Sequence, residues 1–315
     1  MKKSQTDLQL VQFQSTDGLI LPGLLFQPKN KTDKIAIYLH GNGSSSVFYS
    51  VDETNNLGKT LNEKNISFFS FNNRGAHYIH KLHKITKLGK EDVKLGTAFE
   101  LIKDGVKDID GAINFLEELG YKTFYLMGVS TGANKIVVYH YYKSFGKTQD
   151  KSKNKIAKYV LLSGGDDTGL YYQMFGKNKF KKLLKKCLEK IQSKKGSDLI
   201  SKYLDGGLIS YQSLYDTINP DGDYNIFPFN EYMNNLKLSK KQLFKEYKTI
   251  NKPTLVIYGE NDEYCYGDVP RCVSILKKEC PNSKLFTFKI IKGADHGFNG
   301  KEKQLAEIIA NWLKI

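Results

Sequence analysis

The sequence lacks several features that would assign it to a broad class of protein. In its 315 residues there is no run of about 18 uncharged apolar residues, so we expect no membrane-spanning helix. The lysines near its start are not followed by an apolar stretch, so we expect no signal peptide. Its four cysteines have neither metal-binding spacing nor a Cys-x-x-Cys pair. Free thiols in a cytoplasmic protein are therefore expected.

Arginine is also scarce, although the chain is strongly basic. Its 48 lysines and arginines outnumber the 33 acidic residues and give a net charge of +15. Only Arg74 and Arg271 are arginines, whereas recognition of nucleic acids relies heavily on guanidinium forks. The lysines are spread along the whole chain. We therefore expect solvated lysine surfaces, with neither nucleic acid nor membrane as a partner.

The hydrophobic pattern alternates between strands and helices. A leading β-hairpin is expected at 8–13 and 19–27, around Thr16-Asp17-Gly18. Further strands are expected at 34–39, 66–71, 123–129, 159–163, 254–258 and 285–291. Helices are expected at 51–62, 106–119, 131–142 and 302–313. Continuous apolar strands between amphipathic helices are typical of an α/β fold with a mostly parallel, doubly wound sheet.

One long segment interrupts this alternation. Residues 166–251 are helical and irregular, rich in lysine and tyrosine, and lie between two expected strands. We interpret them as a helical cap inserted into a core formed by residues 1–165 and 252–315. Within the cap, apolar residues from Phe180 to Ile191 recur at helical spacing. Such a stripe is expected to pack on its own domain rather than on a membrane or a partner protein.

The pentapeptide Gly128-Val129-Ser130-Thr131-Gly132 carries the strongest chemical signal. It joins an expected strand to an expected helix, which is the setting of a nucleophile elbow. The turn is so tight that the positions flanking the serine must be small, and here both are glycine. Ser130 is therefore predicted to be a nucleophile at the carboxyl edge of the sheet.

A serine nucleophile needs a base and a group that orients the base. His296, in the glycine-flanked loop after the last expected strand, is the predicted base. Asp262, just past the strand at 254–258, is the predicted orienting acid. The alternatives for the acid are Asp295, Asp166 or Asp167 after an earlier strand, and the neighbours Glu260 and Glu263. The order serine, acid, histidine is that of α/β hydrolases.

The loop His40-Gly41-Asn42-Gly43 follows the strand at 34–39. We expect the backbone N–H groups of Asn42 and Thr131 to form an oxyanion hole, and His40 to be a buried structural residue. Arg74 is expected to pair with a neighbouring loop.

The sequence contains only weak signals for a metal site and for a phosphate-binding loop. The three histidines of the HYIHKLH segment recur every third residue, but no carboxylate or cysteine motif accompanies them in their expected loop. The glycines near Gly41 lack the Gly-Lys-Ser/Thr of a phosphate-binding loop. No metal and no cofactor is expected.

Five motifs together resemble the α/β-hydrolase superfamily: HGNG at 40–43, NNRG at 72–75, GVSTG at 128–132, GENDEY at 259–264 and GADHGF at 293–298. The chain further resembles the esterase-like DUF1749 group, some of whose members hydrolyse siderophore esters. That narrower resemblance rests on NNRG, on FE at 99–100, on the GxSTGA pattern at 128–133 and on SYQSLYD at 210–216. It departs at Val129, where many relatives have histidine. The resemblance implies a serine hydrolase and no particular substrate.

The expected protein is thus a cofactor-free serine esterase that acts on a small-molecule ester. The same triad would also serve a peptidase, a thioesterase or an acyltransferase, and a non-catalytic binding protein could use the same fold. Aromatic residues of the cap could line an acyl pocket or simply pack within the cap; they include Tyr171, Tyr172, Tyr211 and Tyr215.

Overall fold

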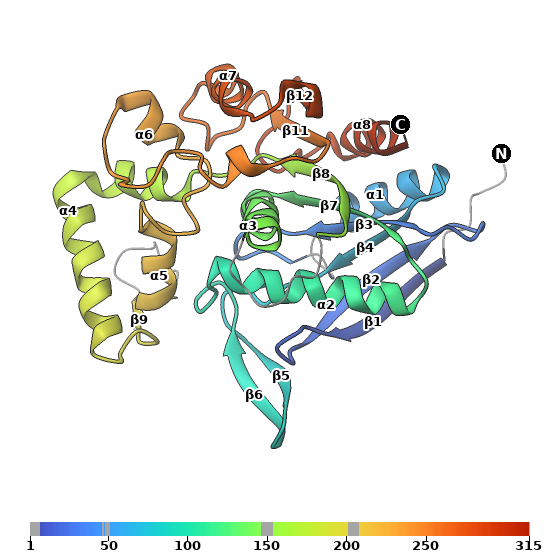
Figure 1. Cartoon of the computed structure of the whole chain (residues 1–315), viewed down its shortest axis with the longest axis horizontal. Coiled ribbons are helices and arrows are strands. Elements are labelled where there is room, and N and C mark those ends of the chain that lie inside the picture. The colour runs from blue at the N-terminus through green and yellow to red at the C-terminus, as the bar shows by residue number, and fades with distance from the viewer. Residues whose placement is uncertain (1–6, 46, 48–50, 146–153, 201–207, 315) are drawn as a thin grey trace.

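A central sheet of eight strands organises the molecule (Figure 1). The computed structural model describes residues 7–45, 47, 51–145, 154–200 and 208–314. The strand order is β1-β2-β4-β3-β7-β8-β11-β12, and the six strands from β4 to β12 in this order are parallel. These strands are β1 Asp7–Gln14, β2 Ile20–Gln27, β3 Lys34–Leu39, β4 Ser67–Phe71, β7 Thr123–Val129, β8 Ile156–Leu162, β11 Thr254–Gly259 and β12 Phe286–Ile291. The predicted doubly wound α/β fold is confirmed.

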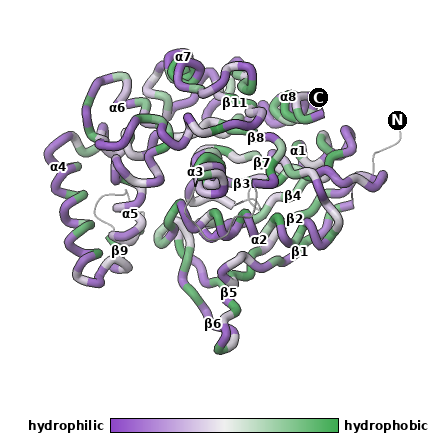
Figure 2. Tube along the Cα trace, viewed as in Figure 1, coloured by the Kyte–Doolittle hydropathy of each residue, from purple (hydrophilic) through white to green (hydrophobic). Residues whose placement is uncertain are grey.

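Helices cover both faces of this sheet because its strands are apolar on both sides. In β3, Ile35 and Ile37 face one core cluster, whereas Ala36 and Tyr38 face the other. The helices are α1 Val51–Glu63, α2 Gly105–Glu118, α3 Thr131–Phe145, α7 Val269–Glu279 and α8 Glu302–Lys314. Helices α2, α3 and α7 cover the first cluster, and α1 and α8 cover the second. Figure 2 shows how hydrophobic residues gather in the central layers of the fold.

The predicted strands and helices are present in the structure, but helix α7 was not predicted, and the region between β4 and β7 differs from expectation. The expected connection there contains a β-hairpin, β5 His80–Thr86 and β6 Gly89–Leu95, which projects from the body of the molecule (Figure 1). His80 and His83 therefore lie on a strand, and the expectation of a loop was wrong. The described residues also contain three short 3-10 helices: η1 Ile102–Asp104, η2 Tyr247–Thr249 and η3 Ser283–Leu285.

The segment after β8 begins with α4, Asp167–Gln192, followed by β9 Leu199–Ile200, β10 Ile209–Ser210, α5 Tyr211–Ile218 and α6 Phe229–Asn234. A kink at Gly176, with φ 69° and ψ 163°, divides α4. The predicted apolar stripe of α4, including Phe180, Leu183 and Cys187, packs in a small cluster with α5. Further along the chain, side chains such as Phe227 and Tyr247 pack into the first core cluster. None of the helices in the described ranges is both long and apolar enough to cross a bilayer.

Candidate active site

Ser130 occupies the sharp turn between β7 and α3. Its backbone has φ 55°, in the left-handed region that residues other than glycine rarely adopt. A Cβ atom on Gly132 would overlap the carbonyl oxygen of Leu39, and one on Gly128 would lie 2.8 Å from the carbonyl carbon of Gly132. Both glycines of the elbow are therefore needed for β7, α3 and β3 to approach this closely.

His296 and Asp262 form a hydrogen-bonded pair beside this turn. The Nδ1 atom of His296 lies 2.9 Å from Oδ1 of Asp262, whose side chain is almost completely buried. The backbone N–H of Tyr264 donates a second hydrogen bond to the same oxygen, at 3.0 Å. The Tyr264 ring packs edge-on against the imidazole, with centroids 4.6 Å apart. With Nδ1 donating to the carboxylate, Nε2 is left free to accept a proton.

A pocket of about 620 Å³ brings Ser130 and His296 together. Gly41, Asn42, Asp167 and Tyr264 also line this space, which we call the Ser130 pocket. Within the described part of the chain, no hydrogen bond joins the Ser130 hydroxyl to His296. Hydrogen bonds between a nucleophile and its base are often long in unliganded enzymes and tighten when substrate binds.

The two predicted oxyanion donors lie near Ser130. Asn42 lines the pocket, and Thr131 is the first residue of α3, where a helix leaves its N–H groups unpaired. A Cβ atom on Gly41 would lie 3.1 Å from Cβ of Ser130, so a larger residue here would crowd the Ser130 turn.

His40 lies behind this loop as a structural residue. Its Nδ1 donates to the carbonyl of Gly41 at 2.8 Å, and its Nε2 accepts the N–H of Asn73 at 3.2 Å. Burial, with help from the charge of Lys135, lowers the pKa of His40 to about 3. The ring is therefore neutral and holds the loop in place, as the sequence suggested.

The alternative acids have other partners. Asp166 caps α4 by accepting the N–H of Gly169, and it also accepts the N–H of Asn230. Asp295 accepts a hydrogen bond from the backbone N–H of Asn299. Glu260 accepts one from the N–H of Gly293, and Glu263 accepts one from the backbone N–H of His296. Among the described residues only Asp262 bonds the imidazole ring.

Asp167 is a pocket residue that sequence reasoning named only as an alternative acid. It lines the Ser130 pocket from the first turn of α4. Burial raises the pKa of its carboxyl to about 6, although the nearby His296 lowers it in part. Its position just after β8 was the available signal, because parallel strands present their following residues at one edge.

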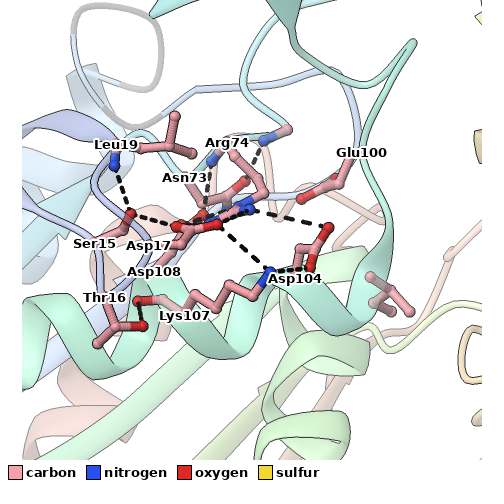
Figure 3. A network of polar contacts seen from close by, with 12 residues as sticks. Ser15, Thr16, Asp17, Leu19, Asn73, Arg74, Glu100, Asp104, Lys107 and Asp108 are labelled. Carbon is pink, nitrogen blue, oxygen red and sulfur yellow. Dashed lines mark hydrogen bonds and ion pairs between the residues drawn. The ribbon is translucent and has the colours of Figure 1, made fainter. Parts of the chain in front are cut away.

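Arg74 is structural, as expected, and Figure 3 shows its network. Its guanidinium lies 2.8 Å from Asp17 in the β1–β2 turn and 2.7 Å from Asp108 on α2. Burial alone would raise the pKa of Asp17, but the hydrogen bonds and charge of Arg74 prevail and lower it to about 2. The network fixes the loop that carries Asn73, the partner of His40.

The histidines of the β5–β6 hairpin take part in no described metal cluster. His83 bonds Asp92 across the hairpin at 2.8 Å, and its side chain is about half exposed. The His77 and His80 rings pack edge-on, 5.6 Å apart. In the described ranges no three metal-ligating side chains come together.

The four tyrosines proposed as pocket walls, Tyr171, Tyr172, Tyr211 and Tyr215, all pack in the small cluster of α4 and α5. Of these, Tyr171 also lines a second pocket that adjoins the first.

Comparison with known proteins agrees with this fold. A family model described as "Protein of unknown function (DUF1749)" matches residues 96–314. No curated protein matches the sequence.

Similar solved structures include the esterase Pf2001 of Pyrococcus furiosus, at 15% identity and a TM-score of 0.55, with 98% of this chain and 92% of that chain covered. Est1E from Butyrivibrio proteoclasticus matches at 14% identity and a TM-score of 0.60, covering 96% and 97%. A soluble variant of the monoglyceride lipase of Saccharomyces cerevisiae, in complex with a substrate analog, matches at 15% identity and a TM-score of 0.61, covering 99% and 96%. At these identities the similarity establishes the α/β-hydrolase fold.

Proposed function

The chain belongs to the DUF1749 family, and on that premise we propose that it is a serine hydrolase that cleaves carboxylic esters through an acyl-enzyme. The observation that carries the proposal is the His296–Asp262 pair at 2.9 Å, on the wall of the pocket that holds the strained Ser130 turn. No metal or cofactor enters the proposed reaction.

In the proposed first step, Oγ of Ser130 attacks the ester carbonyl carbon and His296 Nε2 takes the hydroxyl proton. The carbonyl oxygen becomes an oxyanion that accepts hydrogen bonds from the N–H groups of Asn42 and Thr131. Loss of one such donor typically costs about 10²–10³ in rate. Asp262 keeps the proton of the imidazole on Nδ1 and stabilises the imidazolium that forms.

In the second step the carbon–oxygen bond to the alcohol breaks, and His296 returns the proton to the departing alkoxide. Water then attacks the acyl-enzyme while His296 accepts one of its protons. Collapse of the second intermediate releases the carboxylic acid and restores the Ser130 hydroxyl.

We also propose that residues 166–251 act as a cap that shapes the acyl site. Support comes from the first helix of this segment, because Asp167 and Leu170 of α4 line the Ser130 pocket. The free thiols of Cys187, Cys265, Cys272 and Cys280 are consistent with the cytoplasmic location that we propose.

The test is hydrolysis of 4-nitrophenyl acetate and butyrate by the wild type and by Ser130→Ala. Loss of the nucleophile should lower kcat by about 10⁴-fold or more. Ser163→Ala is the matched control, because Ser163 also directly follows a strand, has a positive φ of 46° and lies outside the Ser130 pocket. Equal activity of Ser130→Ala and the wild type would refute the mechanism. Faster turnover of matched thioesters or peptides would instead assign the site to a thioesterase or a peptidase.

A further inference from the structure

The charge of the Ser130 pocket is opposite to that of the molecule. Four carboxylates line it, from Asp52, Glu53, Asp167 and Glu302, and none of its described lining residues is lysine or arginine. The whole chain has 48 basic residues and a net charge of +15. A pocket with one sign of charge concentrates ligands of the opposite sign.

Asp167 is the carboxylate of this group that has a buried oxygen without a hydrogen bond in the described part of the chain. This oxygen is Oδ2, which is removed from solvent. The neighbouring Asp166 already caps α4 through the N–H of Gly169, so Asp167 is not needed to begin the helix. Glu53, by contrast, accepts a hydrogen bond from the hydroxyl of Tyr38. A buried carboxylate oxygen without a hydrogen bond is costly unless a cation or a donor arrives from elsewhere.

An apolar pocket of about 370 Å³ begins beside the same carboxylate. Asp167, Leu170 and Tyr264 line both pockets, and the second also contacts Tyr171 and Met174. Asp167 therefore lies where the space beside the nucleophile passes into a hydrocarbon-lined space. A ligand that matches both features carries a positive group and an apolar chain.

We propose that Asp167 binds an ammonium group of the substrate, and that the enzyme prefers carboxylic esters with an amine-bearing acyl chain over uncharged esters of the same shape. This inference rests on the proposed esterase function and adds the substrate class. An ammonium group would supply the charge and the hydrogen bond that Oδ2 lacks, whereas a neutral chain would leave this oxygen buried and unpaired.

A different role for Asp167 would have a different signature. The carboxylate also interacts electrostatically with His296. If it acted only by stabilising the imidazolium, its removal would slow every ester by the same factor. The ratio between a charged and an uncharged ester therefore separates substrate binding from a general effect on the base.

The probes are 4-nitrophenyl 6-aminohexanoate and its uncharged isostere, 4-nitrophenyl heptanoate. In the wild type we expect kcat/KM to be about tenfold or more higher for the amino ester. In Asp167→Asn this ratio should fall towards one, while in Asp33→Asn it should remain at the wild-type value. Asp33 is a matched control because it is exposed and precedes β3, at the end of the sheet opposite to Ser130.

A second measurement covers the case in which Asp167→Asn does not fold. Hexylammonium should slow the reaction of wild-type Ser130 with a fluorophosphonate at concentrations where 1-hexanol does not. Equal kcat/KM for the two esters in the wild type, an unchanged ratio in folded Asp167→Asn, or equal protection by the amine and the alcohol would overturn the inference and leave the esterase function standing. Absence of both ester cleavage and Ser130 labelling would overturn the two proposals together.

Discussion

At the scale of single residues, burial and neighbouring charges set the pKa values of two groups near Ser130, His40 and Asp167. His40 has its pKa lowered to about 3, so it is neutral in its structural place. Asp167 has its pKa raised to about 6 because it is buried, with His296 opposing part of that rise. The two residues are suited to different tasks, one to hold a loop and the other to change charge near neutral pH.

The pKa of Asp167 leads to a pH-dependent specificity. Below pH 6 the carboxyl is protonated and cannot attract an ammonium group; above pH 6 it is ionised and can. The ratio of kcat/KM for the amino ester over heptanoate should therefore rise as pH increases from about 5 to 7. An alkyl ammonium stays charged across this range, since its pKa is near 10.4. Rates of the two esters measured at each pH give the ratio directly.

Other ionisable groups near Asp167 affect whether the rise of this ratio with pH can be assigned to Asp167. His296 serves both esters, so its contribution to the rate cancels in the ratio. Tyr171 and Tyr264 have raised pKa values because of burial and stay neutral throughout. Burial raises the pKa values of Asp166 and of Glu53, which lines the Ser130 pocket, to about 7 despite their hydrogen bonds, so both titrate above Asp167. A ratio that does not change with pH, or the same rise in Asp167→Asn, would show that Asp167 is not the group responsible.

At the scale of elements, buried Arg74 ties together three pieces of chain that are distant in sequence. Its bonds join the β1–β2 turn through Asp17, the end of β4 and helix α2 through Asp108 (Figure 3). Asp108 is completely buried and also accepts the backbone N–H of Arg74. Such a network fixes the loop behind His40, and with it the expected oxyanion loop.

Replacing Arg74 should therefore be costly. Arg74→Met leaves the buried charge of Asp108 without its guanidinium, and removal of one partner from a buried pair typically costs about 3–5 kcal/mol. Arg271→Met is the natural control, because the other arginine is exposed and should lose less than about 0.5 kcal/mol. Urea unfolding of the two variants gives both values. A similar, small loss in each would mean that the Arg74 network does not stabilise the fold.

The elements also show where sequence patterns suffice and where they fail. The strands at 34–39 and 123–129 were predicted at the residues where they occur, because buried parallel strands are continuous apolar runs with sharp polar ends. The β5–β6 hairpin was missed because its lysines and histidines alternate with few apolar residues, and its exposed faces give no hydrophobic period. Helix α7 begins with the Asp268 cap and Pro270, a start signal that the sequence reading passed over.

At the scale of the whole molecule, three segments far apart in sequence meet at one edge of the sheet. The elbow at Ser130, the loop at Asn42 and the loop at His296 each follow a parallel strand, so topology alone brings them to the same edge. For this reason the candidate triad could be predicted from order and context. The acidic lining could not, because Asp52 and Glu53 come from α1 and Glu302 from α8, and only the packing of these helices brings them together.

The central claim is that Ser130 is the nucleophile of this pocket, and reaction with a fluorophosphonate tests it most directly. Mass spectrometry of the digested, labelled protein should find one phosphonate adduct, on the peptide that contains Ser130, and His296→Ala should lose it. A folded protein that remains unlabelled, or that carries its adduct on another residue, would contradict the account.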